Sequence, residues 1–206
     1  MSRLVNDLIR EGHLRTESII DAFLKIHRVD FVPGDLREQS EADIALPIGY
    51  GQTISQPLTV AFMLELLDPH SGHNILDIGS GSGWTTALLA HIAGEKGRVT
   101  ALEVIKNLYE IGRENAGKYG FNKKEEVQFY CQSGEKGFER NAPYDRILVS
   151  ASVDEVPEEL KSQLNIGGKM VLPVKNEIWY IEKKKSDDFY IEKFPGFKFV
   201  PFIMKL

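Results

Sequence analysis

The chain is organised around the run Asn74-Ile75-Leu76-Asp77-Ile78-Gly79-Ser80-Gly81-Ser82-Gly83-Trp84. Its first five residues are mostly apolar, which is typical of a short strand buried in a parallel sheet. Three glycines at every second position follow, and residues 84–93 favour a helix. Glycine adopts backbone torsions closed to other residues and lets a ligand approach the main chain, while the helix N-terminus presents free N–H groups. Strand, glycine turn and helix in this order predict a small-ligand site.

The next segment supplies a second feature of a nucleoside site. The run Arg98–Glu103 reads as a strand ending in an acid twenty residues after Gly83, and a carboxylate there can accept both hydroxyls of a ribose. The glycines are spaced Gly-x-Gly-x-Gly with Asp77 two residues ahead, whereas dinucleotide sites need Gly-x-Gly-x-x-Gly. This spacing resembles the loop of class I S-adenosylmethionine-dependent methyltransferases, which hold a nucleoside without a pyrophosphate. The alternative, a glycine turn without a ligand, leaves the register of strand, helix and Glu103 unexplained.

Composition limits the classes of function. The chain has 206 residues, 42% of them hydrophobic and 27% charged, which is ordinary for one globular domain with a full core. A net charge of −5 argues against general nucleic-acid binding, which needs a basic surface. The single cysteine, Cys131, excludes an internal disulfide and fits a reducing compartment. There is no apolar run of ~18 residues and no signal-peptide core, so we expect a cytoplasmic protein. His70 and His73 have no further ligand residues nearby and predict no metal site.

The N-terminal third predicts helices that precede the ligand site. A first helix has an apolar face from Leu4 to Ile9 and stops near Gly12. Thr16 is the expected N-cap of a second helix. His27 falls on the apolar face of that second helix, so we expect it to be a packed or capping residue rather than a ligand.

Residues 43–57 show no helical or strand period and contain two glycines and two prolines. Their Gln, Thr and Ser side chains suggest a loop folded over the cofactor site, and composition alone leaves an ordinary solvent-facing connector equally open. After Pro57 the apolar positions recur with a helical period as far as Leu67. This helix is expected to end at Asp68, which precedes a proline.

The rest of the chain predicts the remaining parts of a sheet. Strands are expected at residues 127–131, 146–150 and 169–172. A helix at 105–119 is expected to turn Ile111 toward the core. Residues 178–203 read as antiparallel strands around a lysine-rich turn that begins at Lys183, and these lysines are expected in solvent.

Strands that alternate with helices predict an α/β fold. We expect a Rossmann-like, doubly wound, mainly parallel sheet with an antiparallel C-terminal hairpin, helices on both faces and an N-terminal helical extension. Ligands bind such sheets outside the carboxyl ends of the strands. Gly79, Glu103 and the pair Ser133–Gly134 are therefore expected at one edge.

Motifs along nearly the whole chain look like those of the protein-L-isoaspartate O-methyltransferase family. The most specific is Gly51-Gln52-Thr53-Ile54-Ser55-Gln56-Pro57. The others, in the family's order and spacing, are Phe31-Val32-Pro33, Leu46-Pro47-Ile48-Gly49, the glycine loop, Pro143-Tyr144-Asp145-Arg146-Ile147, Val156-Pro157, Gln163-Leu164, Gly167-Gly168-Lys169, Leu172-Pro173-Val174 and Phe199-Val200-Pro201. The last of these matches the family's final strand. The resemblance implies one methyltransferase domain over 1–206, with N-terminal helices and a substrate loop in 1–70 and the cofactor-binding sheet and C-terminal strands in 71–206.

The resemblance implies transfer of a methyl group from S-adenosyl-L-methionine to the α-carboxylate of L-isoaspartyl residues in damaged proteins or peptides. A carboxylate is already ionised near pH 7, so its attack needs no general base. The methyl ester would close to a succinimide, which starts repair. By the same resemblance Ser55 is the catalytic residue, and its hydroxyl orients the substrate carboxylate. The implied cofactor-binding residues are Thr53, Ile54, Asp77, Gly79, Ser80, Gly81, Gly83, Glu103, Ser133 and Gly134.

Two residues depart from the family pattern. The family usually has an Asp at the position of Ser133, where it contacts the adenine amino group, and an aromatic residue at the position of Glu41. Both changes concern binding more than bond-making. Three other functions stay open: a methyltransferase of this fold with another substrate, a module that binds cofactor or peptide without turnover, and a Rossmann-like oxidoreductase, which the loop spacing disfavours. The expected partners are isoaspartyl peptides or proteins, not nucleic acid or membranes, and a monomer is the default state.

Overall fold

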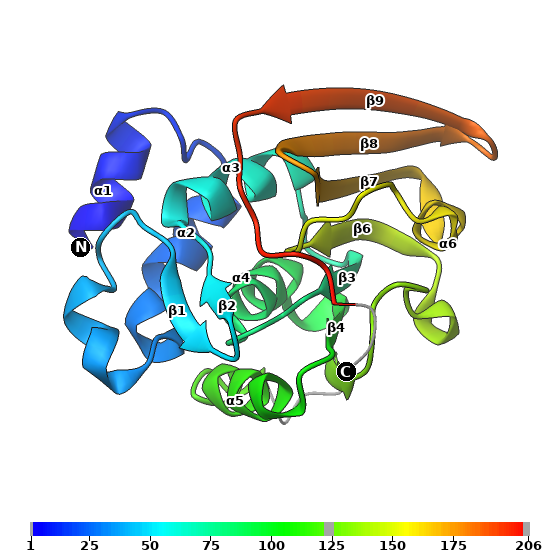
Figure 1. The fold of residues 1–206 in the computed structure, drawn as a ribbon. Helices are drawn as coiled ribbons and strands as arrows, with labels where there is room; N and C mark the ends of the chain where they lie inside the picture. The colour runs from blue at the N-terminus through cyan, green and yellow to red at the C-terminus, as the bar shows by residue number, and fades with distance from the viewer. Residues whose placement is uncertain (1, 122–125, 204–206) are drawn as a thin grey trace.

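The computed structural model describes residues 2–121 and 126–203, which are built on a seven-stranded sheet (Figure 1). The strands are β3 (Asn74–Ile78), β4 (Arg98–Glu103), β5 (Val127–Cys131), β6 (Tyr144–Val149), β7 (Leu164–Val174), β8 (Glu177–Lys185) and β9 (Asp188–Pro195). Their order across the sheet is β5-β4-β3-β6-β7-β8-β9. The strands from β5 to β7 run parallel to their neighbours, and β8 and β9 continue antiparallel. The predicted mainly parallel sheet with an antiparallel C-terminal hairpin is confirmed.

The parallel register brings the carboxyl ends of the central strands to one edge. Ile78, the last residue of β3, pairs with Leu102 of β4 and with Val149 of β6. The glycine loop therefore starts beside Glu103 on one side and Ser150 on the other. The chain adds β4 and β5 on one side of β3 and then β6 and β7 on the other, and such a switch point is where open α/β sheets bind ligands.

Two apolar cores fill the two faces of the sheet. Successive residues of a strand point to opposite faces, so Ile75 joins one core while Leu76 and Ile78 join the other. The helices over the first core are α1 (Arg3–Arg10), α2 (Glu17–Lys25), α3 (Pro57–Leu67), α4 (Trp84–Ala93) and α5 (Lys106–Gly117). The short helix α6 (Glu158–Ser162) and several loops cover the second core. Figure 1 shows α3, α4 and α5 on one side of the sheet and α6 on the other.

The helix boundaries fall close to those predicted. Helix α4 spans the expected residues 84–93, and α3 begins at Pro57, whose missing N–H costs nothing in a first turn. Asp68 ends α3 in the left-handed conformation, with φ of 52°. Thr16 precedes α2 as expected, but its hydroxyl donates to Glu65 (2.8 Å) and does not cap the helix. Short 3-10 helices are η1 (Arg28–Phe31), η2 (Gly34–Gln39), η3 (Gly94–Lys96) and η5 (Glu139–Asn141).

The segment predicted to be irregular contains a β-hairpin. Strands β1 (Leu46–Gly49) and β2 (Gln52–Ile54) pair antiparallel in a sheet of their own, drawn in cyan in Figure 1. The turn between them places Tyr50 and Gly51 at positive φ, 56° and 69°. The prediction of an irregular loop was wrong because strands of three and four residues are too short to show a period of two.

Three side chains lie differently from the sequence prediction. His27 is exposed and does not pack on the apolar face of α2, because that helix ends at Lys25; it stands at the N-cap position of η1, where its side chain makes no capping hydrogen bond. Ile111 of α5 is 39% exposed, because the helix turns Gly112 toward the core beside it. Lys183 is buried and its Nζ donates to the Leu164 carbonyl (2.8 Å), so not all of the turn's lysines are in solvent.

The chain after β9 crosses the carboxyl edge of the sheet as an extended segment, seen in red in Figure 1. An isolated parallel bridge joins Ser152 to Pro201. The expectation of an antiparallel strand continuing to residue 203 is therefore wrong beyond Pro195, and residues 199–201 form no named strand. Among the described residues, none of the helices is both long and apolar enough to cross a membrane.

Candidate active site

A cavity at the carboxyl edge of the sheet holds about 750 Å³ of space, part of it open to solvent. Its wall is formed by the β1–β2 hairpin, by the glycine loop with the end of β4, and by residues 200–203. Eight of the site residues predicted from the sequence belong to this wall: Thr53, Ile54, Ser55, Gly79, Ser80, Gly81, Glu103 and Gly134.

The glycine loop leaves part of the wall without side chains. Gly79 and Gly81 have φ of 77° and 52°, in the left-handed region that other residues rarely adopt. A Cβ added at Gly81 would lie 3.2 Å from Cδ1 of Ile48, which belongs to the hairpin. The hairpin therefore sits closely over the loop, and a larger residue at position 81 would force the two apart.

Glu103 ends β4 and supplies the acidic part of the wall, with 6% of the residue exposed. Its Oε2 accepts the backbone N–H of Gly81 and its Oε1 accepts that of Ile105, both at 2.9 Å. Each carboxylate oxygen has a further lone pair. The carboxylate thus holds the glycine loop in place and still presents acceptors for the hydroxyl groups of a ligand.

Asp77, also predicted as a site residue, lies beneath the loop and outside the wall. It is fully buried and accepts hydrogen bonds from the hydroxyls of Thr85 (3.0 Å) and Thr86 (2.6 Å). Burial raises the pKa of Asp77 to about 6, against the lowering effect of these two bonds. Both threonines belong to the first turn of α4, so Asp77 fastens that helix to β3 behind the cavity.

Gly83 and Ser133 also lie outside the wall. A Cβ at Gly83 would lie 2.5 Å from the carbonyl oxygen of Gly112 in α5, so close packing of this helix already requires a glycine there. The Ser133 hydroxyl accepts the backbone N–H of Glu135 (3.3 Å), while the neighbouring Gln132 belongs to the wall. The roles of Asp77, Gly83 and Ser133 in cofactor binding stay predictions.

Glu41, the other departure from the family pattern, does not line the cavity. Its Oε2 accepts the hydroxyl of Ser2 (2.6 Å) and the backbone N–H of Leu4 (3.2 Å). These groups stand at the N-terminus of α1, where unpaired N–H groups and the helix dipole favour a carboxylate. Glu41 thus ties α1 to the segment that precedes the hairpin.

Ser55 lies on the wall between β2 and α3. Asp43 fixes the start of α3, because its Oδ1 accepts the Leu58 N–H (2.8 Å) and its Oδ2 accepts the Gln56 Nε2 (2.9 Å). Nη2 of Arg28 donates to the Ser55 carbonyl (3.2 Å). Sequence reasoning missed Arg28 and Asp43, since contacts to partners 13 to 27 residues away leave no motif.

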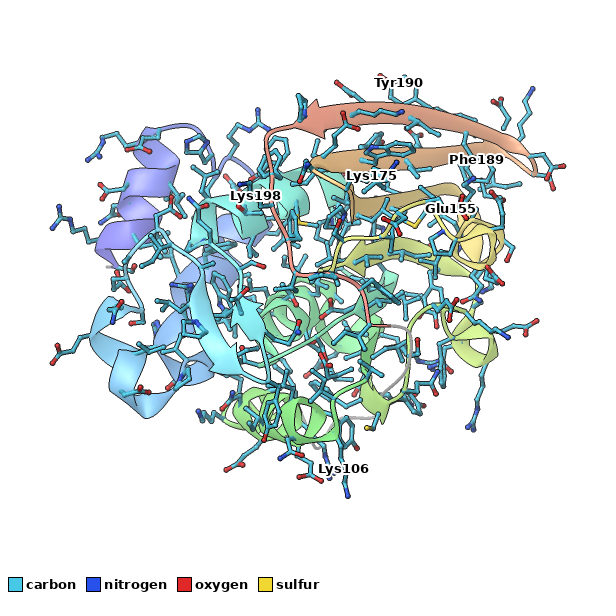
Figure 2. The ribbon with its side chains drawn as sticks, viewed as in Figure 1. Lys106, Glu155, Lys175, Phe189, Tyr190 and Lys198 are labelled. Atoms are coloured by element: carbon cyan, nitrogen blue, oxygen red, sulfur yellow. The ribbon has the colours of Figure 1, made fainter. Side chains whose placement is uncertain are left out.

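The C-terminal segment completes the wall, and sequence reasoning did not place it there. Backbone N–H of Ser152 donates to the Val200 carbonyl (2.8 Å), and that of Phe202 donates to the Ser152 carbonyl (2.9 Å). These bonds fix the segment across the cavity. Figure 2 labels Lys198, which lies on the chain as it descends from β9 toward this position. The resemblance of residues 199–201 to the family motif was the available sequence signal, but it indicated a strand and not a part of the cavity wall.

The described wall mixes polar and apolar groups and is almost uncharged. Among the described residues of the wall, Glu103 is the one with an ionisable side chain. The others are glycines or carry hydroxyl, amide, indole or apolar side chains. The described residues include no group of three or more His, Cys, Asp or Glu that could hold a metal ion. The arrangement can bind a hydroxyl-bearing ligand and position a second one, without a histidine or lysine to act as a base.

Known proteins resemble this chain over its whole length. The family model described as protein-L-isoaspartate(D-aspartate) O-methyltransferase matches residues 1–206. A protein-L-isoaspartate O-methyltransferase from Methanopyrus kandleri is 43% identical over 205 residues, which cover 98% of this chain and 90% of the relative. One from Thermococcus onnurineus is 42% identical over 204 residues, covering 97% and 91%.

Solved structures share the fold. A crystal structure from Plasmodium falciparum in complex with S-adenosyl-L-homocysteine superposes with a TM-score of 0.88 at 24% identity and covers 98% of both chains. A structure described as protein-L-isoaspartate O-methyltransferase gives a TM-score of 0.86 at 29% identity, over 97% of this chain and 64% of that one. The family match and the two relatives above 40% identity lead to one conclusion. The chain belongs to the protein-L-isoaspartate(D-aspartate) O-methyltransferase family.

Proposed function

We propose that this protein transfers a methyl group from S-adenosyl-L-methionine to the α-carboxylate of L-isoaspartyl residues in damaged proteins or peptides. The observation that carries the proposal is one shared cavity: Ser55 of the family's most specific motif and the glycine loop line the same wall. Residues 1–70 contribute the hairpin and residues 71–206 the loop, so both parts of the chain act as one unit.

The wall fits S-adenosylmethionine in three respects. The glycine loop offers close approach to the main chain, and Glu103 offers acceptors for ribose hydroxyls. Leu102 and Ile105 beside it offer apolar surface for a base. The buried Ser80 hydroxyl and Trp84 indole N–H have no hydrogen-bond partner within the described protein, as expected of groups completed by a ligand or water.

These residues define the cofactor site that we propose. The Gly79–Gly81 loop and Glu103 would hold the nucleoside and amino-acid parts, and Thr53 and Ile54, which belong to β2, would contact the cofactor from the hairpin. When bound, S-adenosylmethionine supplies an activated methyl group on a sulfonium sulfur. The hairpin and residues 200–203 both belong to the wall and would limit the access of water.

The chemistry asked of the protein is alignment rather than proton transfer. The substrate carboxylate is ionised near pH 7 and attacks without a general base. This agrees with a described wall whose one acid, Glu103, is engaged with two backbone N–H groups. Ser55 would orient the carboxylate by a hydrogen bond from its hydroxyl, and correct orientation is itself a large source of rate. The backbone nitrogen of the following residue then attacks the ester carbonyl and releases methanol, and the succinimide so formed hydrolyses to initiate repair.

Transfer of a labelled methyl group tests the proposal. Purified protein is incubated with methyl-labelled S-adenosylmethionine and a peptide containing one L-isoaspartyl residue, with the ordinary aspartyl peptide as control. Label is expected in the isoaspartyl peptide alone. Equal labelling of both peptides, or no labelling by protein that binds S-adenosylhomocysteine, would contradict it. The monomeric state and the cytoplasmic location stay predictions.

A further inference from the structure

We propose that Arg28 is a positioning residue for methyl transfer, because its buried guanidinium holds the backbone of residues 40–55 and sets the place of Ser55 in the cavity. This inference rests on the proposed function for its kinetic consequence. Its structural consequence can be measured without any methyl transfer.

The guanidinium of Arg28 donates hydrogen bonds to four backbone carbonyls. Nη1 donates to the carbonyls of Ser40 (3.1 Å) and Ala42 (3.2 Å), and Nη2 donates to those of Ile44 (2.8 Å) and Ser55 (3.2 Å). The four terminal N–H groups of an arginine are thereby all used. The acceptors lie 12 to 27 residues further along the chain and converge only when the segment takes one shape. Arg28 therefore fixes both ends of the segment that contains the hairpin.

Arg28 carries its charge in the protein interior without an ion pair. The residue is 5% exposed, and no salt bridge joins it to an acid among the described residues. Burial lowers the pKa of Arg28 to about 10, partly opposed by the charge of Asp43. Removing a cation from water is costly unless polar groups surround it. Here those groups are the carbonyls of the segment, so the segment and the cation stabilise each other.

Two further contacts connect this anchor to the cavity. Asp43 binds the first turn of α3 through the Leu58 N–H, so Ser55 is held by Arg28 at its own carbonyl and is followed at once by a helix start that Asp43 fixes. On the other side, Cζ of Arg28 lies 5.5 Å from the centroid of the Trp84 ring, and Trp84 belongs to the wall beside the glycine loop. Arg28 thus stands directly behind the wall and touches both the Ser55 segment and the cofactor side.

The substitutions that test this role are Arg28→Lys and Arg28→Gln. Lysine keeps the charge but has three donors on one nitrogen, which cannot reach four separated carbonyls. Glutamine keeps an amide donor and removes the buried charge. A buried charge without its partners is the main cause by which a variant at this position would fail to fold. Lys183→Met is the matched control. Lys183 is also a buried cation bonded to carbonyls, those of Lys161 and Leu164, and it does not line the cavity.

Hydrogen exchange of backbone amides gives the first readout. In both Arg28 variants the amides of the β1–β2 hairpin should exchange at least ~10-fold faster relative to those of β3, because the segment opens locally. Lys183→Met should leave the hairpin at its wild-type rate. The inference is overturned if, in Arg28→Lys and Arg28→Gln, the hairpin amides exchange at the same rate relative to those of β3 as they do in the wild type.

Kinetics give the second readout. The rate of isoaspartyl methylation at saturating substrates should fall ~10- to 100-fold in the Arg28 variants, while the dissociation constant of S-adenosylhomocysteine changes by less than ~3-fold. A merely structural role would lower the amount of folded protein and leave the rate per folded molecule intact, and that result overturns the inference. If the wild-type protein methylates no isoaspartyl peptide, the proposed function fails, and the exchange measurement alone decides whether Arg28 holds Ser55.

Discussion

Replacing Glu103 by alanine should weaken cofactor binding and destabilise the glycine loop together. The carboxylate accepts the N–H groups of Gly81 and Ile105, both at 2.9 Å, in a residue that is 6% exposed. Charge-assisted bonds from its remaining lone pairs to ribose hydroxyls are worth ~1.5–3 kcal/mol, so the dissociation constant of S-adenosylhomocysteine should rise roughly 10- to 100-fold.

Glu103→Ala should also lower the thermal midpoint. Each buried N–H left without an acceptor costs ~1–3 kcal/mol. Two of them cost at least ~2 kcal/mol, which corresponds to a fall of roughly 4 °C or more for a chain of this size. Calorimetric titration and differential scanning calorimetry measure the two effects separately.

Glu65→Ala is the matched control. The side chain of Glu65 is 6% exposed and accepts the backbone N–H groups of Arg15 (2.8 Å) and Thr16 (2.9 Å), but it does not line the cavity. This variant should lose stability and keep its affinity for S-adenosylhomocysteine.

A cofactor analogue separates ribose recognition from loop support. The 2′-deoxy analogue of S-adenosylhomocysteine should bind the wild-type protein more weakly than the parent compound, and Glu103→Ala should bind both alike, because the coupling between two partners vanishes when one is removed. A change in affinity of less than about twofold in Glu103→Ala would refute a contact between this carboxylate and the ribose, and so would a variant that discriminates the two compounds as the wild type does.

The remaining predictions concern the glycines, Ser55 and Asp77. Gly81→Val should abolish S-adenosylhomocysteine binding and leave the circular dichroism spectrum unchanged, and undiminished affinity would contradict this prediction. Gly83→Ala should instead lower the thermal midpoint, because its Cβ would lie 2.5 Å from the carbonyl oxygen of Gly112. Ser55→Ala should lower the rate of isoaspartyl methylation ~10- to 100-fold and leave cofactor affinity within about twofold, as single-turnover kinetics and titration can check. Burial raises the pKa of Asp77 from 3.8 to about 6 in the folded protein, so between these values the folded state holds a proton that the unfolded chain has lost. The stability contributed by this site is therefore present below about pH 4 and is lost as the pH rises to about 6, and Asp77→Asn should gain ~1–3 kcal/mol relative to wild type in urea unfolding at pH 7 but not at pH 4. An equal difference at both pH values would show that Asp77 does not titrate in this window.

Local patterns predicted the glycine-loop part of the cavity well. The apolar run at Ile75, the glycine spacing and the helix from Trp84 all report on neighbours in the sequence, and β3 and α4 form where expected. Glu103 followed from the same unit, because parallel strands share a carboxyl edge. The resemblance then located Ser55, which no periodicity would have singled out.

Contacts between distant residues explain what the sequence did not predict. The four carbonyls bound by Arg28 belong to a segment whose shape exists only in the folded chain. Lys183 is buried because α6 ends beside it, although lysines in a turn usually face solvent. Phe202 reaches the cavity through bonds to Ser152, 50 residues earlier. Such pairings depend on topology, which a single sequence does not display.

The position of the transferred methyl group tests the central claim most directly. A peptide that contains one L-isoaspartyl and one ordinary aspartyl residue is incubated with the protein and S-adenosylmethionine, and tandem mass spectrometry then locates the ester before it closes to the succinimide. The ester should lie on the α-carboxylate of the isoaspartyl residue. An ester on the aspartyl side chain, or none in protein that binds S-adenosylhomocysteine, would contradict a cavity built to align an isoaspartyl carboxylate with the cofactor.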